Sequence, residues 1–417
     1  MPADAARGVT TAVAPDDGAD RASHGFPARN DHAPGPPRVR QIDAEVAPTV
    51  ERHLTELLAR RVAQATATHA IFGTDVAERL ARFTLGGGRR IRPQFLWWGM
   101  RACGLPDDEQ IDAALHLCVA LELLQTCALV HDDVMDRAPT RRSRPSLHID
   151  CAAQYAAPAR PDPHRFGEAA AILIGDLALA WADDEAGALL LPGRRAGRIR
   201  ETWSRMRMEM VAGQYLDIQG EITQTRSRSQ AISAACLKTA RYTVERPLQL
   251  GAILGGADET TLRALCSAGG GAGLAFQLRD DLDDVFTGPS HRDKPVGGDL
   301  RAGKPTYLLA LAHSRAEADG DRHALHVLNR CLGRPGFDET DLDDVRHVLE
   351  RTGARRSVEE KVHRLIAQSM RELDTVPLDP AARVHLRTLM HQSAGAPAPP
   401  TEPERGRSTV AVEGAVT

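Results

Sequence analysis

The stretch IDAALHLCVALELLQTCALVHDDVMD, residues 111–136, is almost continuously apolar until it ends in three aspartates. Its apolar residues recur at helical spacing, which predicts a long and largely buried α-helix. Asp132, Asp133 and Asp136 form a D-D-x-x-D motif at its end. Residues i and i+4 share one helix face, and i+1 lies about 100° away, so the three carboxylates can converge on one small volume.

A second D-D-x-x-D motif, made of Asp280, Asp281 and Asp284, follows AGLAFQLR (272–279). An acidic run is commonly a solvated helix face. Here the helices themselves are predicted to be buried, where clustered carboxylates are costly unless a cation neutralises them. No set of cysteines or histidines stands beside the motifs, and oxygen ligands favour Mg²⁺, which often binds together with substrate phosphates. Two such motifs therefore predict a magnesium site.

Positive charge gathers in loops near the motifs. The loop GGGRRIRP (86–93) places arginines after glycines that let the backbone approach a ligand, and a further arginine pair follows the first motif. Arginine forks match phosphate oxygens. These observations favour two anionic groups, one held by metal and one held directly by arginines. The candidate anion-binding residues are Arg89, Arg90, Arg92, Arg141, Arg142, Lys238, Lys294 and Lys304.

The remaining chain is mostly Ala/Leu/Arg/Glu-rich with apolar residues at helical spacing, and strand-like alternation is scarce. The fold class is therefore predicted to be all-α. Residues 1–43 and 393–417 are rich in Pro, Ala and Gly without apolar periodicity, so both are expected to be disordered tails. The folded domain is expected to span residues 44–392.

Composition narrows the possible partners and the compartment. The 417 residues carry a formal net charge of −4, so no overall basic field would attract nucleic acid. The seven scattered cysteines are typical of a reduced, cytoplasmic protein. Neither a signal peptide nor about 18 consecutive uncharged apolar residues is present, so no membrane span is expected.

The motifs, in this order, resemble those of the trans-isoprenyl diphosphate synthases, most closely the actinobacterial geranylgeranyl diphosphate synthases. The resemblance covers residues 48–375, and the fold it implies is a single large helical bundle with the active-site cavity in its core. It implies a prenyltransferase that joins isopentenyl diphosphate to an allylic diphosphate by ionisation, condensation and elimination. The matching segments are GGGRRIRP, LELLQTCALVHDDVMDRAPTRRSRPSLH, ILIGDLALA, GQYLD, KTARYTVERPLQLGA, FQLRDDLDDVF and KPVGGDLRAGKPT.

The resemblance also implies residue roles and a homodimer. Three Mg²⁺ ions are expected on Asp132, Asp133, Asp136, Asp280, Asp281 and Asp284. The allylic diphosphate is expected to contact Arg141, Lys238, Lys294 and Lys304. The isopentenyl diphosphate is expected to contact Arg89, Arg92, Gln125 and Arg142. The carbocation is expected to pass Thr239 and Gln277. Arg89 stands where the family usually has lysine, and Gln125 where many members have histidine.

Product length is predicted from the helix that ends in the first motif. In farnesyl diphosphate synthases of this family, an aromatic residue four or five positions before the first aspartate closes the product tunnel early. Here those positions are Ala128 and Cys127, which are small. Leu123 and Leu124 lie about one turn deeper and are the expected floor. Geranylgeranyl diphosphate is therefore the predicted product.

Other interpretations remain open. A class I terpene cyclase shares the fold and the first motif, but usually has a different second metal motif. A catalytically silent subunit of a heteromeric synthase would tend to lose one motif. An HD-type phosphohydrolase, suggested by His131 and Asp132, would need further histidine ligands. His131 is expected to be a buried structural residue, and Tyr242 a core residue.

Overall fold

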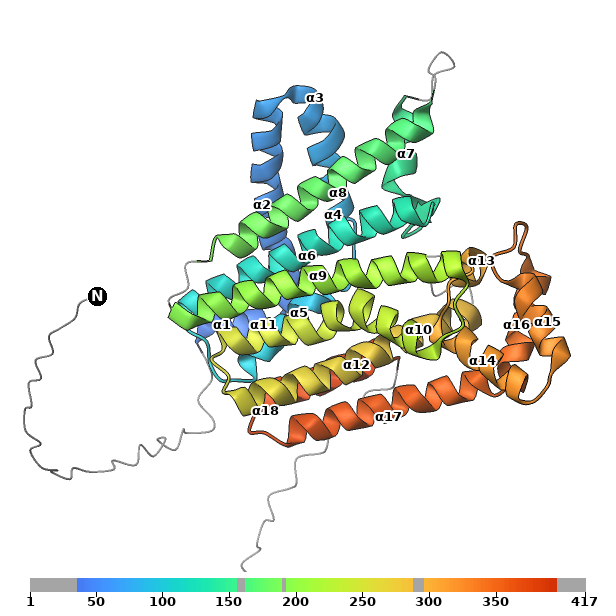
Figure 1. Ribbon diagram of the computed structural model, residues 1–417. Helices are drawn as coiled ribbons and strands as arrows, with labels where there is room; N and C mark the ends of the chain where they lie inside the picture. Colours follow the sequence, from blue (N-terminus) through green and yellow to red (C-terminus); the bar gives the residue numbers. More distant parts are fainter. Residues whose placement is uncertain (1–35, 156–161, 190–192, 288–295, 396–417) are drawn as a thin grey trace, which may run out of the picture.

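The computed structural model describes residues 36–155, 162–189, 193–287 and 296–395, and they are almost entirely helical (Figure 1). The predicted all-α class is confirmed. The elements in chain order are α1 Pro37–Ala44, α2 Val46–Thr68, α3 Ala70–Phe72, η1 Gly73–Ala77, α4 Glu78–Leu85, α5 Ile91–Arg101, α6 Asp108–Met135, β1 Thr140–Arg141, β2 Arg144–Pro145, α7 Leu147–Gln154, α8 Pro163–Gly187, α9 Gly193–Thr223, α10 Arg228–Ala235, η2 Cys236–Glu245, α11 Arg246–Leu254, α12 Glu259–Phe286, α13 Gly298–Ala302, α14 Tyr307–Ala318, α15 Arg322–Cys331, α16 Glu339–Arg351, α17 Ala354–Asp374 and α18 Pro380–Ser393.

Helix α6 is the central helix and carries the first aspartate motif. Asp107 begins it with a capping box, in which its side chain accepts from the Gln110 backbone and the Gln110 side chain accepts from the Asp107 N–H. The helix packs against α8, α5 and α2. By length and composition it could cross a membrane, but 78% of its most apolar window is buried within the fold. It is thus a core helix.

The second motif is at the end of α12, which packs against η2 and α17. The segment η2 is a stretch of π-helix, a wider winding that often occurs at functional sites. Its neighbours approach it very closely. A Cβ added to Gly213 of α9 would lie 2.1 Å from the Lys238 backbone nitrogen, and one added to Gly273 of α12 would lie 2.3 Å from the Ala240 oxygen. Glycine at these two positions lets α9 and α12 close around η2.

Two details differ from the predictions. Helix α1 lies in the segment that was predicted to be an N-terminal tail. It belongs to the fold, because Val39 and Ile42 are buried against the core. The predicted boundary at residue 44 is therefore too late. The basic loop after the first motif contains a small antiparallel hairpin, in which Thr140 pairs with Pro145 and Arg141 with Arg144. The C-terminal helix α18 ends at Ser393, next to the predicted boundary.

Candidate active site

A cavity of about 680 Å³ lies between α6, α9, η2 and α12. Its volume is within the usual range for a small-molecule site. Most of the sequence-predicted residues line it, although they come from distant parts of the chain, whereas Lys294 lies outside the described residues. The predicted residues in the lining are Arg89, Arg90, Arg92, Gln125, Cys127, Ala128, Asp132, Arg141, Arg142, Lys238, Thr239, Gln277, Asp280, Asp281 and Lys304.

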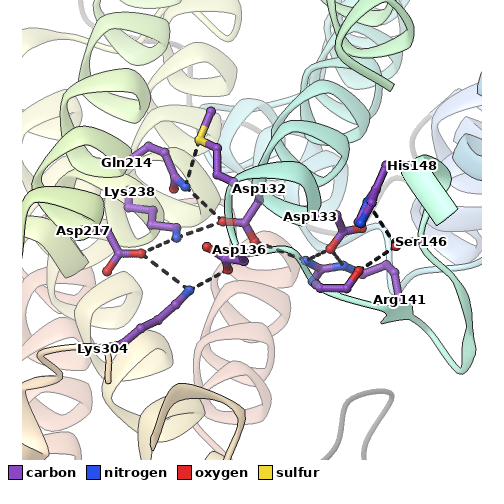
Figure 2. Close-up of polar contacts among 12 residues, drawn as sticks. Asp132, Asp133, Asp136, Arg141, Ser146, His148, Gln214, Asp217, Lys238 and Lys304 are labelled. Atoms are coloured by element: carbon purple, nitrogen blue, oxygen red, sulfur yellow. Dashed lines mark hydrogen bonds and ion pairs between the residues drawn. The ribbon is translucent and has the colours of Figure 1, made fainter. Parts of the chain in front are cut away.

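Asp132 is the centre of the first aspartate cluster (Figure 2). Its carboxylate accepts hydrogen bonds from Lys238 Nζ at 3.0 Å, Arg141 Nη2 at 3.1 Å and Gln214 Nε2 at 3.2 Å. Lys238 also donates to Asp217 at 2.6 Å. Burial alone would lower the pKa of Lys238, but the neighbouring carboxylates, Asp132 first, raise it. Lys238 is therefore a charged group beside the motif.

Asp136 is one turn further along α6 and meets a second lysine. Lys304 Nζ donates to Asp136 at 2.7 Å and lies 3.7 Å from Asp217 (Figure 2). Although burial opposes its charge, the carboxylates of Asp217, Asp299 and Asp136 raise the pKa of Lys304 well above its usual value. The ammonium groups of Lys238 and Lys304 therefore occupy the space between carboxylates where cations are favoured.

Asp133 has a different environment from the other two members of the motif. Its side chain is 1% exposed and is held by Arg141, whose Nε donates to it at 2.9 Å. Asp133, like Asp136, lies outside the cavity lining, whereas Asp132 and Arg141 are in it. Because Asp133 is on the side of α6 that faces the hairpin, its geometry supports a role in positioning Arg141 rather than the predicted role as a metal ligand.

The second motif divides in a similar way. Asp280 and Asp281 line the cavity, and Gln277 Nε2 donates to Asp281 at 2.8 Å. Burial, followed by the negative charge of Asp299, raises the pKa of Asp281 well above its usual range. Asp284 lies outside the lining and accepts the backbone N–H of Asp299 at 3.0 Å, so it anchors α13. Asp283 pairs with Arg279 on the same helix at 3.5 Å, and its side chain is 36% exposed, so it faces outward.

The arginine side of the cavity is organised around Tyr242. Arg92 stacks over the Tyr242 ring, with its Cζ 4.3 Å from the ring centroid, and donates to Thr243 Oγ1 at 3.0 Å. Tyr242 is 3% exposed, as predicted for a core residue, but its hydroxyl donates to Gln125 Oε1 at 2.8 Å. Because Oε1 of Gln125 accepts this bond, the amide group available to a ligand is the Nε2 donor.

Arg90 differs from its neighbours in the GGGRRIRP loop. It has a left-handed backbone, with φ 48°, and its side chain turns into the fold. There it pairs with Glu122 of α6 at 2.6 Å and donates to the Thr84 carbonyl at 3.0 Å. The side chains of Arg90 and Glu122 are both almost completely buried, and the charge of each compensates the charge of the other. Arg90 borders the cavity, but its side chain fixes the loop to α6 and α4, which leaves Arg89 and Arg92 as the candidate ligand-binding arginines of this loop.

The far part of the cavity is apolar. Cys127 and Ala128 of α6, Leu179 of α8, and Met210 and Val211 of α9 all line it. The predicted small residues are therefore where a hydrocarbon chain would need space.

Leu123 and Leu124 are fully buried but are not in the lining. The prediction that these leucines form the floor is wrong, because their side chains pack into the core.

His131 is structural. Its Nε2 lies 3.1 Å from the Ile172 carbonyl oxygen, and a Cβ added to Gly175 would lie 2.2 Å from it. The ring thus packs against the backbone of α8, as predicted for a structural residue, but it also lines the cavity and is 23% exposed, so the prediction that it is buried is wrong. Among the described residues, no further histidine, cysteine or acidic residue joins it in a group that could hold a metal. The phosphohydrolase interpretation has no support.

Comparisons with known proteins agree with this cavity. The sequence model of the polyprenyl synthetase family matches residues 74–349. The chain belongs to the polyprenyl synthetase family. It is 35% identical to a geranylgeranyl pyrophosphate synthase from Corynebacterium glutamicum, whose crystal structure contains isoprenyl diphosphate and magnesium. That likeness covers 82% of this chain and 98% of that one, with a TM-score of 0.74.

Curated relatives differ in product. A (2E,6E)-farnesyl diphosphate synthase from Mycobacterium tuberculosis is 28% identical over 73% of this chain and 78% of its own. A geranylfarnesyl diphosphate synthase from Aeropyrum pernix is also 28% identical, over 73% of this chain and 88% of its own. This polyprenyl synthetase is therefore a prenyl-transferring enzyme, and its relatives alone do not specify its product length.

The donor set of this polyprenyl synthetase suits a hard divalent cation. Asp132, Asp280 and Asp281 offer oxygen ligands, and a cation bound there would offset the burial that raises the pKa of Asp281. In the described part of the chain, no three carboxylates are close enough to hold an ion by themselves. Ions here would therefore share their coordination with substrate diphosphate.

Several cavity residues were missed or undecided from the sequence. Gln214 and Asp217, of the segment GQYLD, were given no role from the sequence, and both lie in the lining. Their i, i+3 spacing on α9 was the available signal. Tyr242 was assigned to the core alone, and nothing local in KTARYTVERP predicts its bond to a residue more than a hundred positions earlier. Thr243 and Asp299 also line the cavity and were not predicted from the sequence.

Proposed function

We propose that this polyprenyl synthetase elongates an allylic diphosphate with isopentenyl diphosphate and releases geranylgeranyl diphosphate. The observation that carries the proposal is the division of one cavity into three parts. Carboxylates with lysines form the first part, arginines with Gln125 the second, and small and apolar residues the third. Two diphosphates and a growing hydrocarbon chain require this combination.

The allylic diphosphate would lie at the two aspartate motifs. The proposed ligands of Mg²⁺ are Asp132, Asp136, Asp280 and Asp281. The resemblance to the family implies three ions. When bound, Mg²⁺ would supply positive charge to the departing diphosphate. Asp133 and Asp284 are proposed to support the site from outside the cavity, through Arg141 and the Asp299 backbone respectively.

The chain's own cations would complete this diphosphate site. Three cations, Arg141, Lys238 and Lys304, already pair with the motif carboxylates. When a diphosphate arrives with Mg²⁺, the metal can take over these carboxylates and the three cations can turn to the diphosphate. No charged group is then left buried without a partner. Lys294 is proposed to join them.

Isopentenyl diphosphate would bind to Arg89, Arg92, Arg142 and Gln125. Thr239 and Gln277 line the same cavity and are proposed to lie along the path of the carbocation. Since Gln277 donates its amide N–H to Asp281, its amide oxygen is the end available to a developing positive charge. The same walls exclude water from the carbocation, and no side-chain nucleophile is required.

Product length would be set by space beyond the aspartates. Cys127 and Ala128 leave the first turn before Asp132 open, which supports a chain longer than farnesyl. A further turn is about 5.4 Å, comparable with one extended isoprene unit, which supports one additional condensation.

The proposed assembly is a cytoplasmic homodimer. Exposed apolar side chains occur on α8, at Ile172 and Leu173, and on α9, at Met208, Val211 and Tyr215. Such a concentration is unusual on a surface that faces only water. All seven cysteines are free, which supports a reducing compartment. Light scattering of the purified protein would measure the oligomeric state.

The direct test supplies purified protein with Mg²⁺, isopentenyl diphosphate and dimethylallyl, geranyl or farnesyl diphosphate. The expected product is geranylgeranyl diphosphate, and chelation of the metal should abolish its formation. Consumption of the allylic substrate without isopentenyl diphosphate, with release of a cyclic hydrocarbon, would instead identify a terpene cyclase. Absence of turnover until a second, different subunit is added would identify a silent subunit.

A further inference from the structure

We propose that Leu179 of α8 is the floor of the product channel and sets the length of the chain. The proposal rests on the proposed function, and it supplies the floor that Leu123 and Leu124 of α6 do not provide. Unlike those two leucines, Leu179 lines the cavity, and it is partly buried against the core.

The register of α8 on α6 gives the depth of each residue of α8. The two helices pack along one another (Figure 1). Near the aspartate motif, His131 Nε2 of α6 lies 3.1 Å from the Ile172 carbonyl oxygen of α8. Toward the other end of α6, His116 Nδ1 lies 2.8 Å from Glu185 Oε2. The helices are therefore antiparallel, and both advance at nearly the same pace between these two contacts.

Leu179 lies between the two contacts. It follows Ile172 by seven positions and precedes Glu185 by six, which corresponds to residues 122–124 on α6. This is the level at which a floor was predicted from the sequence. The residue that reaches the channel at this level belongs to the facing helix α8 rather than to α6.

Helix α9 runs in the same direction as α6. Close to the aspartate motif, Gln214 Nε2 donates to Asp132 at 3.2 Å. Trp203 Nε1 of α9 donates at 2.8 Å to Asp183, which follows Leu179 by four positions on α8. Residues of α9 that precede Gln214 therefore lie progressively further from the aspartates.

The other apolar lining residues of α6 and α9 lie nearer to the aspartates than Leu179 does. None of them precedes Asp132 on α6, or Gln214 on α9, by much more than one turn. They are Cys127, Ala128, Leu129, Met135, Met210, Val211, Tyr215, Leu216 and Ile218.

At the level of Leu179, the neighbouring helices offer no other apolar lining residue. Leu124 of α6 and Met206 of α9 are fully buried and outside the lining. Glu122 borders the cavity at this depth, but on the arginine side, where it pairs with Arg90. Leu179 is therefore the apolar side chain of these helices at which the channel ends.

A floor at Leu179 fits the proposed product. Its level lies about one turn beyond Cys127 and Ala128, and a turn of about 5.4 Å is comparable with one extended isoprene unit. A chain that reached Leu179 would meet a branched side chain held against a close-packed core. Shortening of Leu179 would therefore deepen the channel, whereas shortening of Leu124 would only leave a hollow in the core.

The test compares the products of the wild type with those of Leu179→Ala. Loss of the branched end of the side chain deepens the channel, so the ratio of longer products to the main wild-type product should rise about tenfold or more. A change of one methylene in a hydrophobic pocket already gives discrimination of about this size. Leu179→Phe raises the floor and should instead raise the share of shorter products. Chromatography of the dephosphorylated alcohols would measure both ratios.

The matched control is Leu177→Ala. Leu177 is a partly buried leucine two positions away on the same helix, but it does not line the cavity. This variant loses the same atoms and should keep the wild-type distribution. The proposal is overturned if either Leu179 variant is active and keeps the wild-type distribution, or if the control shifts it equally. A wild type that makes no polyprenyl diphosphate would instead refute the proposed function.

Discussion

Replacement of Tyr242 by phenylalanine should weaken binding of isopentenyl diphosphate and spare the allylic substrate. The hydroxyl of Tyr242 donates to Gln125 Oε1 at 2.8 Å inside a site where the tyrosine is 3% exposed. The bond holds the amide with Nε2 toward the cavity. Phenylalanine keeps the ring under Arg92, at 4.3 Å, so only the orientation of Gln125 is lost.

The expected magnitude follows from one neutral hydrogen bond. Such a bond contributes about 0.5–1.5 kcal/mol, so the KM for isopentenyl diphosphate should rise about two- to thirteenfold. Tyr242→Leu removes the stacking on Arg92 as well, which is worth about 0.5–2 kcal/mol, and should raise this KM further. Burial raises the pKa of Tyr242 far above neutrality, so the hydroxyl remains a donor throughout the accessible pH range.

Steady-state kinetics with each substrate varied in turn would measure the effect. The KM for the allylic diphosphate should stay within about twofold of the wild type, since Tyr242 has no contact with the aspartate motifs. Gln125→His, in which an imidazole donor replaces the amide, should make the KM less sensitive to Tyr242→Phe. Equal increases in both KM values, or no change in either, would refute the positioning role.

Three further outcomes are expected. Asp280→Ala should lower turnover by about a hundredfold or more at saturating Mg²⁺, whereas Asp283→Ala, at the outward position of the same motif, should have little effect; equal losses would disprove the division of the motif. Cys127→Phe should shorten the product, as measured by chromatography of the dephosphorylated alcohols, and an unchanged length would mean that this turn of α6 does not border the tail. The hydrogen bond to Glu185 raises the pKa of His116 above its usual value, so the stability contributed by this pair should be complete below about pH 6.5 and lost as the pH rises through the folded pKa. Thermal unfolding of His116→Ala should therefore differ more from the wild type at about pH 5.5 than at about pH 8.5, and a constant difference would contradict the linkage.

Local spacing explains which parts of the site were predictable. Asp132 and Asp136 are four residues apart on α6, so any helical register places them on one face, and both meet lysines in the structure. The spacing of Asp280 and Asp281 with Gln277 works in the same way on α12. The all-α class was predictable for the same reason, because helices are encoded by patterns within a few turns.

Contacts between helices explain what was not predictable. Asp133 belongs to the motif by sequence, but its partner Arg141 is on the hairpin, and only the folded chain shows that this pairing buries it. Leu124 is apolar and at the correct depth, yet it packs into the core rather than into the channel. Asp183 and Arg207 are on different helices, and no pattern within either helix indicates that they meet.

The placement of the first motif at a helix C-terminus adds a further reason why the site favours cations. Helix α6 ends at Met135, so Asp132 and Asp133 lie in its last turn, whereas Asp280 and Asp281 lie more than one turn before the end of α12 at Phe286. A helix C-terminus carries a partial negative charge, which favours cations and disfavours carboxylates there. The carboxylates of the first motif thus work against the stability of their own helix. Lys238 of η2 pairs with Asp132, and Lys304, after α13, pairs with Asp136. A sequence that accepts such a local conflict gains a site that favours cations, including metal ions that arrive with a diphosphate.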